Sequence, residues 1–221
     1  VSNNKKHKSA RESESMKKII SVGLLLLAVS GVAQAADSPP ALAATCAACH
    51  GDQGQGNAAL GTPRLAGQQA DYLLHQLRSF KAGKRGYDAQ DSYGAQMRAI
   101  VTGLDDAAFE QLASYYAGVK IDAEKSAGGA DVARGEALFQ GTCAACHGPR
   151  GEGFAQLKTP RLNILDGAYI DRQLTHYIEG VRGGDDHADQ LGLWMRGVAL
   201  QVGEKADRQA IIDYIATLPA D

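Results

Sequence analysis

The chain has 221 residues, of which 23 are basic and 25 acidic, so its formal net charge is −2. This nearly neutral balance argues against a nucleic-acid partner, which would require a strongly basic face. All four cysteines fall in two short motifs, and a chain of this length favours two small domains over one large domain.

Residues 1–35 have the composition of a segment that is removed after export. Met16-Lys17-Lys18 is a short basic start, Ile19–Val29 is apolar, and Ala33-Gln34-Ala35 is a small-residue cleavage site. A membrane anchor is the alternative, but this apolar run is shorter than the roughly 20 residues of a spanning helix. We therefore expect a cleavable signal peptide behind a polar extension, Val1–Ser15, and a protein exported to the periplasm. The true start, Val1 or Met16, stays open.

The expected mature chain, Ala36–Asp221, has 186 residues with 17 basic and 23 acidic side chains, a net charge of −6. Offsetting its sequence by 97 residues superimposes its two halves, and Thr62–Leu65 then falls on Thr159–Leu162. A repeat of this length indicates a tandem domain duplication. We expect domains at 36–124 and 125–221, joined by a linker within Ile121–Ala130.

The motif Cys-Ala-Ala-Cys-His occurs once in each half, at Cys46–His50 and Cys143–His147. This motif is typical of c-type haem attachment, in which two thiolates add to the haem vinyl groups and the histidine binds the iron. The sequence therefore predicts two covalently bound haem c groups. The predicted attachment and ligand residues are Cys46, Cys49, His50, Cys143, Cys146 and His147.

Two other interpretations of the cysteine pairs were considered. A thioredoxin-like pair is expected beside a strand–helix–strand pattern, and neither half has a convincing strand. A structural zinc site usually has its pairs about 15–20 residues apart, whereas these pairs are 97 residues apart. Neither interpretation explains why a histidine follows both pairs.

Each half predicts the same order of helices, and the fold is therefore expected to be all-α. The first helix runs into the motif, over Ala41–Cys46 after a cap at residues 38–40, and over Val132–Cys143 after Asp131. Middle and final helices follow from apolar residues on one helical face. These residues are Leu73, Leu77 and Phe80, then Phe109, Leu112 and Tyr116, and in the second half Ile170, Leu174 and Tyr177, then Ile211, Tyr214 or Ile215, and Leu218, with Pro219 as the stop.

Long irregular stretches, His50–Gly67 and Gly83–Tyr93, separate these predicted helices. Such loops usually count against an assignment in a small domain. A buried haem resolves this conflict, because loops can pack against its large apolar surface.

The second iron ligand of each haem is predicted to be a methionine. Met97 and Met195 lie 47 and 48 residues after His50 and His147, and no other methionine remains in the mature chain. The alternative is that both simply fill the core, as most methionines do. His/Met coordination closes the iron to substrates and favours one-electron transfer. His187 is the rival ligand for the second haem.

Further residues are predicted to support the haems. Pro63 and Pro160 each lie 13 residues after a motif histidine, and their backbone carbonyls are expected to accept its second ring N–H. Four arginines repeat between the halves, and they either pair with haem propionates or lie on the surface as ordinary arginines. They are Arg64, Arg85, Arg161 and Arg182. His75 and His176 do not repeat and are interpreted as polar-face residues of the middle helices.

These features together resemble the cytochrome c4 family of di-haem class I cytochromes c, over the whole of Ala36–Asp221. The resemblance is carried by the Ala-x-Ala signal, both Cys-Ala-Ala-Cys-His-Gly motifs, both Thr-Pro-Arg-Leu segments, and Met97 and Met195. It implies two cytochrome c domains related by pseudo-twofold symmetry, with haem propionates facing each other. It also implies a periplasmic electron carrier that serves a haem–copper terminal oxidase.

Three functions follow from this reading. The first is an electron shuttle from a membrane quinol-oxidising complex to a terminal oxidase. The second is a di-haem enzyme of the peroxidase or thiosulfate dehydrogenase type, which would need an open or exchangeable iron position. The third is a cytochrome subunit of a larger dehydrogenase. Peripheral membrane association, the reduction potentials and the physiological partners stay open.

Overall fold

The computed structural model describes residues 40–120, 128–184 and 187–220. The predicted signal peptide and the predicted boundary between residues 124 and 125 lie outside the described residues. Within these ranges the secondary structure is helical, and the only pairing of the β type is an isolated bridge between Asn57 and Thr62. The all-α prediction is confirmed. No helix in the described part has the length and hydropathy needed to cross a bilayer.

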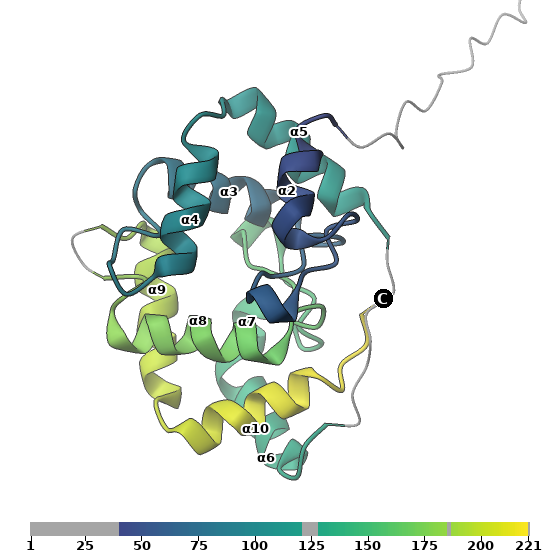
Figure 1. The fold of residues 1–221 in the computed structure, drawn as a ribbon. Helices are drawn as coiled ribbons and strands as arrows, with labels where there is room; N and C mark the ends of the chain where they lie inside the picture. The colour runs from purple at the N-terminus through teal and green to yellow at the C-terminus, as the bar shows by residue number, and fades with distance from the viewer. Residues whose placement is uncertain (1–39, 121–127, 185–186, 221) are drawn as a thin grey trace, which may run out of the picture. The chain divides into compact units, whose positions relative to one another are not determined.

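The first half contains four α-helices among its described residues (Figure 1). They are α2 (Ala43–His50), α3 (Ala70–Lys81), α4 (Ser92–Val101) and α5 (Asp106–Gly118). Helix α3 packs against both α4 and α5. The predicted middle and final helices therefore correspond to α3 and α5.

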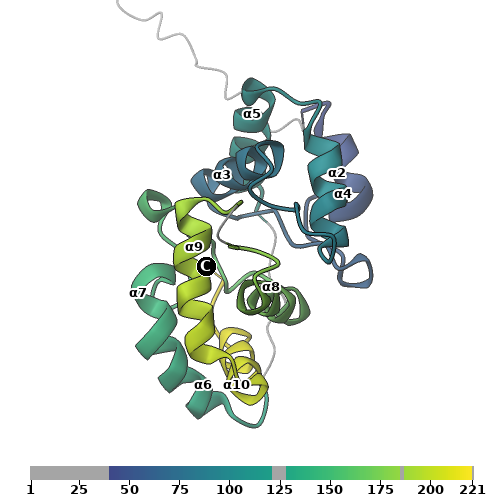
Figure 2. The ribbon, with the colours of Figure 1, turned by 90° about the vertical axis from the view of Figure 1, so that its left-hand side faces the viewer.

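The second half repeats this order (Figure 2). Its helices are α6 (Val132–Leu138), a π-helical turn (Phe139–Cys143), α7 (Ala144–His147), α8 (Gly167–Glu179), α9 (Gln190–Ala199) and α10 (Lys205–Ile215). Helix α10 packs against α6 and α8, and α8 packs against α9. Residues 39–221 form one compact unit, in which α3 also contacts the short 3-10 turn Ala155–Leu157 of the second half.

The helices that carry the haem motifs differ from the prediction in both halves. Helix α2 begins at Ala43 rather than Ala41, and it continues through the motif to His50. The second copy was expected to be one regular helix, but a π-helical turn interrupts it before α7 reaches His147. Asp131 occupies the N-cap position there without making a side-chain capping bond.

Helices α4 and α9 were not predicted, although both expected methionine ligands lie on them. Each has a glycine in its first turn, Gly94 or Gly192, and glycine weakens a helix signal. A Cβ atom at Gly94 would collide with the carboxylate of Asp91, which caps α4. The glycine that weakens the helix signal is therefore required by the cap.

The predicted apolar faces form the cores of the two halves. All of the predicted residues on these faces are buried except Leu77, which is half-buried. Helix α10 ends at Ile215, so Pro219 does not terminate it as expected, and Leu218 joins the core from beyond the helix. Phe139, in the π-helical turn, is fully buried and packs against Tyr214, with ring centroids 5.5 Å apart.

Candidate haem sites

The motif histidines are buried at the ends of α2 and α7, and each is 7% exposed. His50 Nδ1 lies 2.8 Å from the carbonyl oxygen of Pro63, and His147 Nδ1 lies 3.2 Å from that of Pro160. These are the expected hydrogen bonds. Burial lowers the pKa of both imidazoles, and the contact with the carbonyl offsets this only in part. A neutral ring that donates from Nδ1 leaves the Nε2 lone pair free to bind a metal.

A threonine before each of these prolines ties the same loop to the motif. Thr62 Oγ1 donates to the carbonyl of Cys49, and Thr159 Oγ1 donates to the carbonyl of Cys146, both at 2.6 Å. Each Thr-Pro pair thus holds the motif at two successive residues. The sequence analysis did not assign this role, although the repetition of threonine in both halves was a signal for it.

Cys46 and Cys143 lie in apolar surroundings, whereas Cys146 is exposed, and none of the four cysteines is paired in a disulfide. Cys46 packs against the cluster of Leu73 and Tyr116, and Cys143 packs against the cluster of Phe139. Burial raises the pKa of Cys46, and it raises the pKa of Cys143 to about 11. Thiolate metal sites require the opposite shift. These surroundings suit thiols that border an apolar group.

Met97 and Met195 both face the core of their own half. Met97 packs against Phe80, Val101 and Phe109. Met195 packs against the same cluster as Cys143. In the first half, the clusters of Cys46 and Met97 are joined by side chains that contact both, namely Leu74, Leu77 and Leu104. In each half, a motif cysteine and a methionine therefore lie against the same apolar core. This arrangement fits a haem.

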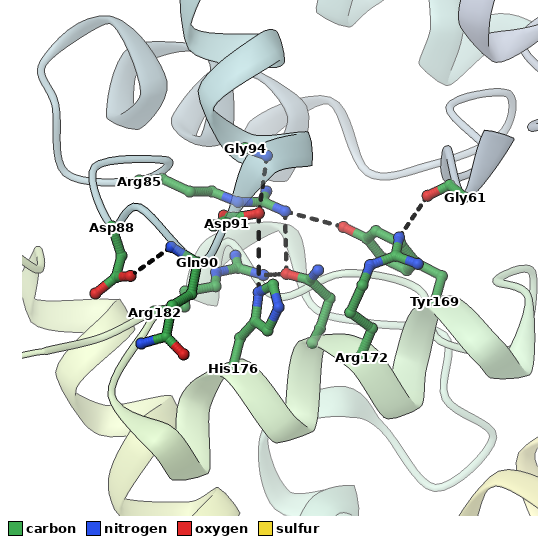
Figure 3. A network of polar contacts seen from close by, with 11 residues as sticks. Gly61, Arg85, Asp88, Gln90, Asp91, Gly94, Tyr169, Arg172, His176 and Arg182 are labelled. Atoms are coloured by element: carbon green, nitrogen blue, oxygen red, sulfur yellow. Dashed lines mark hydrogen bonds and ion pairs between the residues drawn. The ribbon is translucent and has the colours of Figure 1, made fainter.

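Two of the four repeated arginines meet at the contact between the halves (Figure 3). Arg85 and Arg182 are buried, and each donates both to the glutamine of its own half and to that of the other half, Gln76 or Gln173, at 2.6–3.2 Å. Arg85 also contacts the hydroxyl of Tyr169 at 3.0 Å.

These partners of Arg85 and Arg182 are neutral amide and phenol oxygens, and Arg85 Nε has no hydrogen-bond partner. Burial alone would raise the pKa of Tyr169, but the nearby guanidinium groups of Arg85 and Arg182 lower it. A buried charge is costly unless an opposite charge compensates it. This cationic cluster therefore fits the carboxylates of a haem.

The other two arginines bind backbone carbonyls. Arg64 Nε donates to Ala66 at 2.9 Å, and Arg161 donates to Gly67 at 3.1 Å and to Ala220 at 2.6 Å. Because Gly67 belongs to the first half, Arg161 also links the halves. These contacts give both arginines a role in holding loops, and Arg64 is buried, so the surface interpretation is wrong for that residue.

The other three histidines among the described residues lie where the two halves meet. His187 is exposed and stacks on the ring of Tyr87, with centroids 4.5 Å apart. His75 and His176 were interpreted as polar-face residues, but each is partly buried against an aspartate of the opposite half, Asp189 or Asp91. Neither aspartate was predicted as a contact residue. Asp91 and Asp189 are nevertheless 98 residues apart, the same offset that relates the two methionines.

Comparison with known proteins agrees with this geometry. The family model for cytochrome c matches the chain twice, at residues 40–120 and 132–219. The fold and the sites thus define a c-type cytochrome of two domains, each with one covalently bound haem c.

Similar proteins narrow the class further. The cytochrome c4 of Pseudomonas aeruginosa is 36% identical, and the match covers 92% of this chain and all of that protein. The crystal structure of reduced cytochrome c4 from Pseudomonas stutzeri is 34% identical, with a TM-score of 0.64 over 79% of this chain and 94% of that one. The chain belongs to the cytochrome c4 family, and it is a di-haem electron-transfer cytochrome. This membership decides for haem over the disulfide and zinc interpretations.

Two further similarities concern thiosulfate oxidation. A thiosulfate dehydrogenase electron acceptor from Thiomonas intermedia is 36% identical, and the match covers 92% of both chains. A thiosulfate dehydrogenase from Marichromatium purpuratum is 26% identical, with a TM-score of 0.61 over 79% of this chain. This chain spans 36% of that larger protein.

Proposed function

We propose that the protein is a periplasmic shuttle that carries single electrons from a membrane quinol-oxidising complex to a haem–copper terminal oxidase. In this proposal both haems have His/Met axial ligation, from His50 and Met97 in one half and from His147 and Met195 in the other. The observation that carries it is the repetition of one arrangement. In each half, a buried neutral histidine and a methionine that faces inward lie at the edge of an apolar core.

The roles of the residues follow from their positions. The four motif cysteines hold the haems covalently, and the loop carbonyls of Pro63 and Pro160 orient the histidine rings. Haem supplies reversible one-electron exchange between Fe(II) and Fe(III) when it is bound. A histidine and a methionine from each half would hold the haem iron, and this pair would leave no position for a substrate. The apolar side chains exclude water and limit reorganisation around the site.

Arg85 and Arg182 have a supporting role in this proposal. Their buried guanidinium groups contact neutral oxygens from both halves. We assign them as the counter-charges of the haem propionates at the contact between the halves. Holding both carboxylate sets in one polar cluster would bring the two redox groups close to each other.

The optical spectrum of the purified ferric holoprotein tests the ligation. Methionine bound to Fe(III) gives a weak far-red band, and we expect a band intensity that accounts for two haems per chain. Met97→Ala and Met195→Ala should each remove about half of it, because each variant opens one of two closed sites. A high-spin fraction in the wild-type protein would favour the di-haem enzyme with an open iron position, and an unchanged band in both variants would refute ligation by these two methionines.

A second candidate is the electron acceptor of a thiosulfate dehydrogenase. The similarity to such acceptors from Thiomonas intermedia and, at 30% identity, Stutzerimonas stutzeri favours this candidate specifically. Stopped-flow mixing of the oxidised holoprotein with a thiosulfate dehydrogenase and thiosulfate, or with a quinol-oxidising complex and quinol, separates the two. The physiological donor should reduce both haems at low micromolar protein. If only the thiosulfate system does so, the quinol-dependent proposal is wrong.

The proposed location depends on residues 1–35. N-terminal sequencing of the protein from a periplasmic extract should give Ala36 as the first residue. A mature protein that begins at Val1 or Met16, retained in the cytoplasm without haem, would contradict the proposed export. Fractionation of the same cells would show whether the mature protein stays with the membranes.

A further inference from the structure

The two methionine-bearing helices are capped by equivalent aspartates. Asp91 accepts a hydrogen bond from the backbone N–H of Gly94 at the start of α4, and Asp189 accepts one from Gly192 at the start of α9, both at 2.8 Å. Such a bond satisfies one of the free N–H groups of the first turn and fixes where a helix begins.

The carboxylate of Asp189 is also held by the first half of the molecule. Its Oδ2 accepts a hydrogen bond of 2.7 Å from the hydroxyl of Ser79, and it lies 3.0 Å from His75 Nε2 in the geometry of an ion pair rather than of an aligned hydrogen bond. Ser79 and His75 are both residues of α3. One carboxylate therefore joins the start of α9 to the middle helix of the other half.

The equivalent contact of Asp91 is looser. His176 of α8 approaches the Oδ1 of Asp91 only to 3.9 Å, and its Nδ1 has no hydrogen-bond partner (Figure 3). The difference has a cause in the sequence, because the repeat places His176 where the first half has Ser79, and Arg172 where it has His75. The carboxylate that caps α9 is thus clamped by the opposite half, whereas the carboxylate that caps α4 is not. The start of α4 meets the opposite half through Tyr93 instead, whose ring centroid lies 4.6 Å from the guanidinium of Arg172.

We propose that Asp189 is a positioning residue for Met195, and that Ser79 and His75 of the first half set its position. This inference rests on the proposed role of Met195 as an iron ligand. Met195 lies six residues after Asp189, roughly 9 Å along a helix of regular rise. A helix segment of this length moves nearly as a rigid body, so a shift of its first turn moves the methionine as well. The haem of the second half then senses the first half through the cap of its methionine helix, a route that the looser contact of Asp91 does not provide in the other direction.

Conservative variants of the full-length holoprotein test this proposal. Asp189→Asn keeps the helix cap, because asparagine caps as well as aspartate, but it loses the negative charge that Ser79 and His75 contact. Ser79→Ala removes the hydrogen bond from the opposite half, far from the capped turn in sequence. Asp91→Asn is the matched control, since it makes the same change where the clamp is absent.

The readout is the displacement of methionine from ferric haem by cyanide, followed at the far-red band. We expect Asp189→Asn and Ser79→Ala to speed the displacement of one methionine by roughly tenfold, the factor that corresponds to one hydrogen bond to a charged group. The other haem should react at the wild-type rate, and Asp91→Asn should leave both rates unchanged. Haem content and thermal unfolding would show that each variant is loaded and folded.

The outcomes that overturn the proposal are distinct from failure of the ligand assignment. If Met195→Ala retains the far-red intensity of two haems, Met195 is not a ligand and the proposed function fails together with this inference. If Met195→Ala loses one band while Asp189→Asn reacts at the wild-type rate, only the positioning role is wrong. Equal acceleration by Asp91→Asn and Asp189→Asn would also refute it, because the clamp would then make no difference.

Discussion

The two halves of the molecule agree closely around the haem sites and differ where they touch. His50 and His147 each reach a proline carbonyl 13 residues later, and each has a threonine that supports the same loop. By contrast, Ser79 and its counterpart His176 make different contacts with the opposite half. Duplicated residues hold the cofactor, and diverged residues make the two copies unequal. Two equivalent haem sites can thus become distinct without any change in the residues that are expected to bind the iron.

The polar cluster between the halves is the exception to this division. Gln76, Arg85, Gln173 and Arg182 are all repeated, and they still cross from one half to the other. Around this symmetric centre lie asymmetric contacts, such as the bond from Arg172 to the carbonyl of Gly61 and the stacking of Tyr87 on His187. The centre of the contact is thus common to both copies, and its edges distinguish them.

The largest expected effect comes from removing one haem at a time, which tests whether the two halves attach their haems independently. Replacing Cys46 and Cys49 with alanine, or Cys143 and Cys146, should lower the haem content from two per chain to one, because each motif attaches its own haem. Haem per protein is measured from the pyridine haemochrome and from the intact mass. If either double variant lost both haems, the halves would not be independent in cofactor attachment.

A second test concerns the core residue that precedes each motif. Phe139 is fully buried in the second half, and the equivalent residue of the first half, Leu42, is only half-buried. Phe139→Ala should lower the free energy of unfolding by about 3–5 kcal/mol, as is usual for a buried aromatic, and Leu42→Ala by clearly less. Guanidinium unfolding of the holoproteins measures both. Equal losses would show that the two motif helices depend on their cores to the same extent.

A smaller effect concerns the threonine that supports each proline loop. Thr62→Val and Thr159→Val each remove the hydrogen bond to a cysteine carbonyl while keeping the side-chain volume, and Thr159→Val also removes the bond of 2.9 Å that its Oγ1 accepts from the backbone N–H of Phe154. Because one hydrogen bond contributes about 1 kcal/mol, Thr62→Val should lower the free energy of unfolding by about 1 kcal/mol and Thr159→Val by about 2 kcal/mol. Thermal unfolding of the two variants side by side measures the difference. A loss in only one half would show that the repeated contact is not equivalent.

The smallest effect is a dependence of stability on acid pH at Asp189. Burial alone would raise the pKa of this carboxyl, but contacts from His75, Ser79 and the backbone of Gly192 lower it below its ordinary value. A pKa that is lower in the folded state stabilises the protein above about pH 4, the value for the unfolded chain, and this contribution is lost as the pH falls further. The difference in melting temperature between the wild-type protein and Asp189→Asn should therefore shrink from pH 6 to pH 3. A difference that stayed constant would contradict the shift.

Much of the fold could be predicted from the sequence because the signals were local. The apolar spacing of Leu73 and Phe80, or of Ile170 and Leu174, marks one face of a helix, and the structure buries these residues. The bonds from His50 and His147 to their prolines followed from equal spacing in the two halves. Helices α4 and α9 were not found in this way, and each has a glycine in its first turn that weakens the helix signal.

The contacts between the halves could not be predicted for a different reason. His75 and Asp189 are 114 residues apart in sequence, and nothing local to either residue indicates the other. Their meeting depends on how two folded halves dock. Polar residues on a helix face are therefore predicted to face solvent, although in the folded protein the opposite half covers them. The repeat held one usable signal, because Asp91 and Asp189 occupy the same position before the two methionines.

The reciprocal arrangement of Arg85 with Gln173 and of Arg182 with Gln76 has the form of a homodimer contact, in which each residue meets its partner's counterpart. Between separate molecules, so polar a contact would be weak at cellular concentration. Here a covalent connection raises the effective concentration of one half near the other to about the millimolar range. Tandem duplication can thus keep the two halves together without a high affinity of one half for the other. The surface between the two halves is therefore free to remain polar and charged, whereas the interface of a permanent dimer is usually apolar.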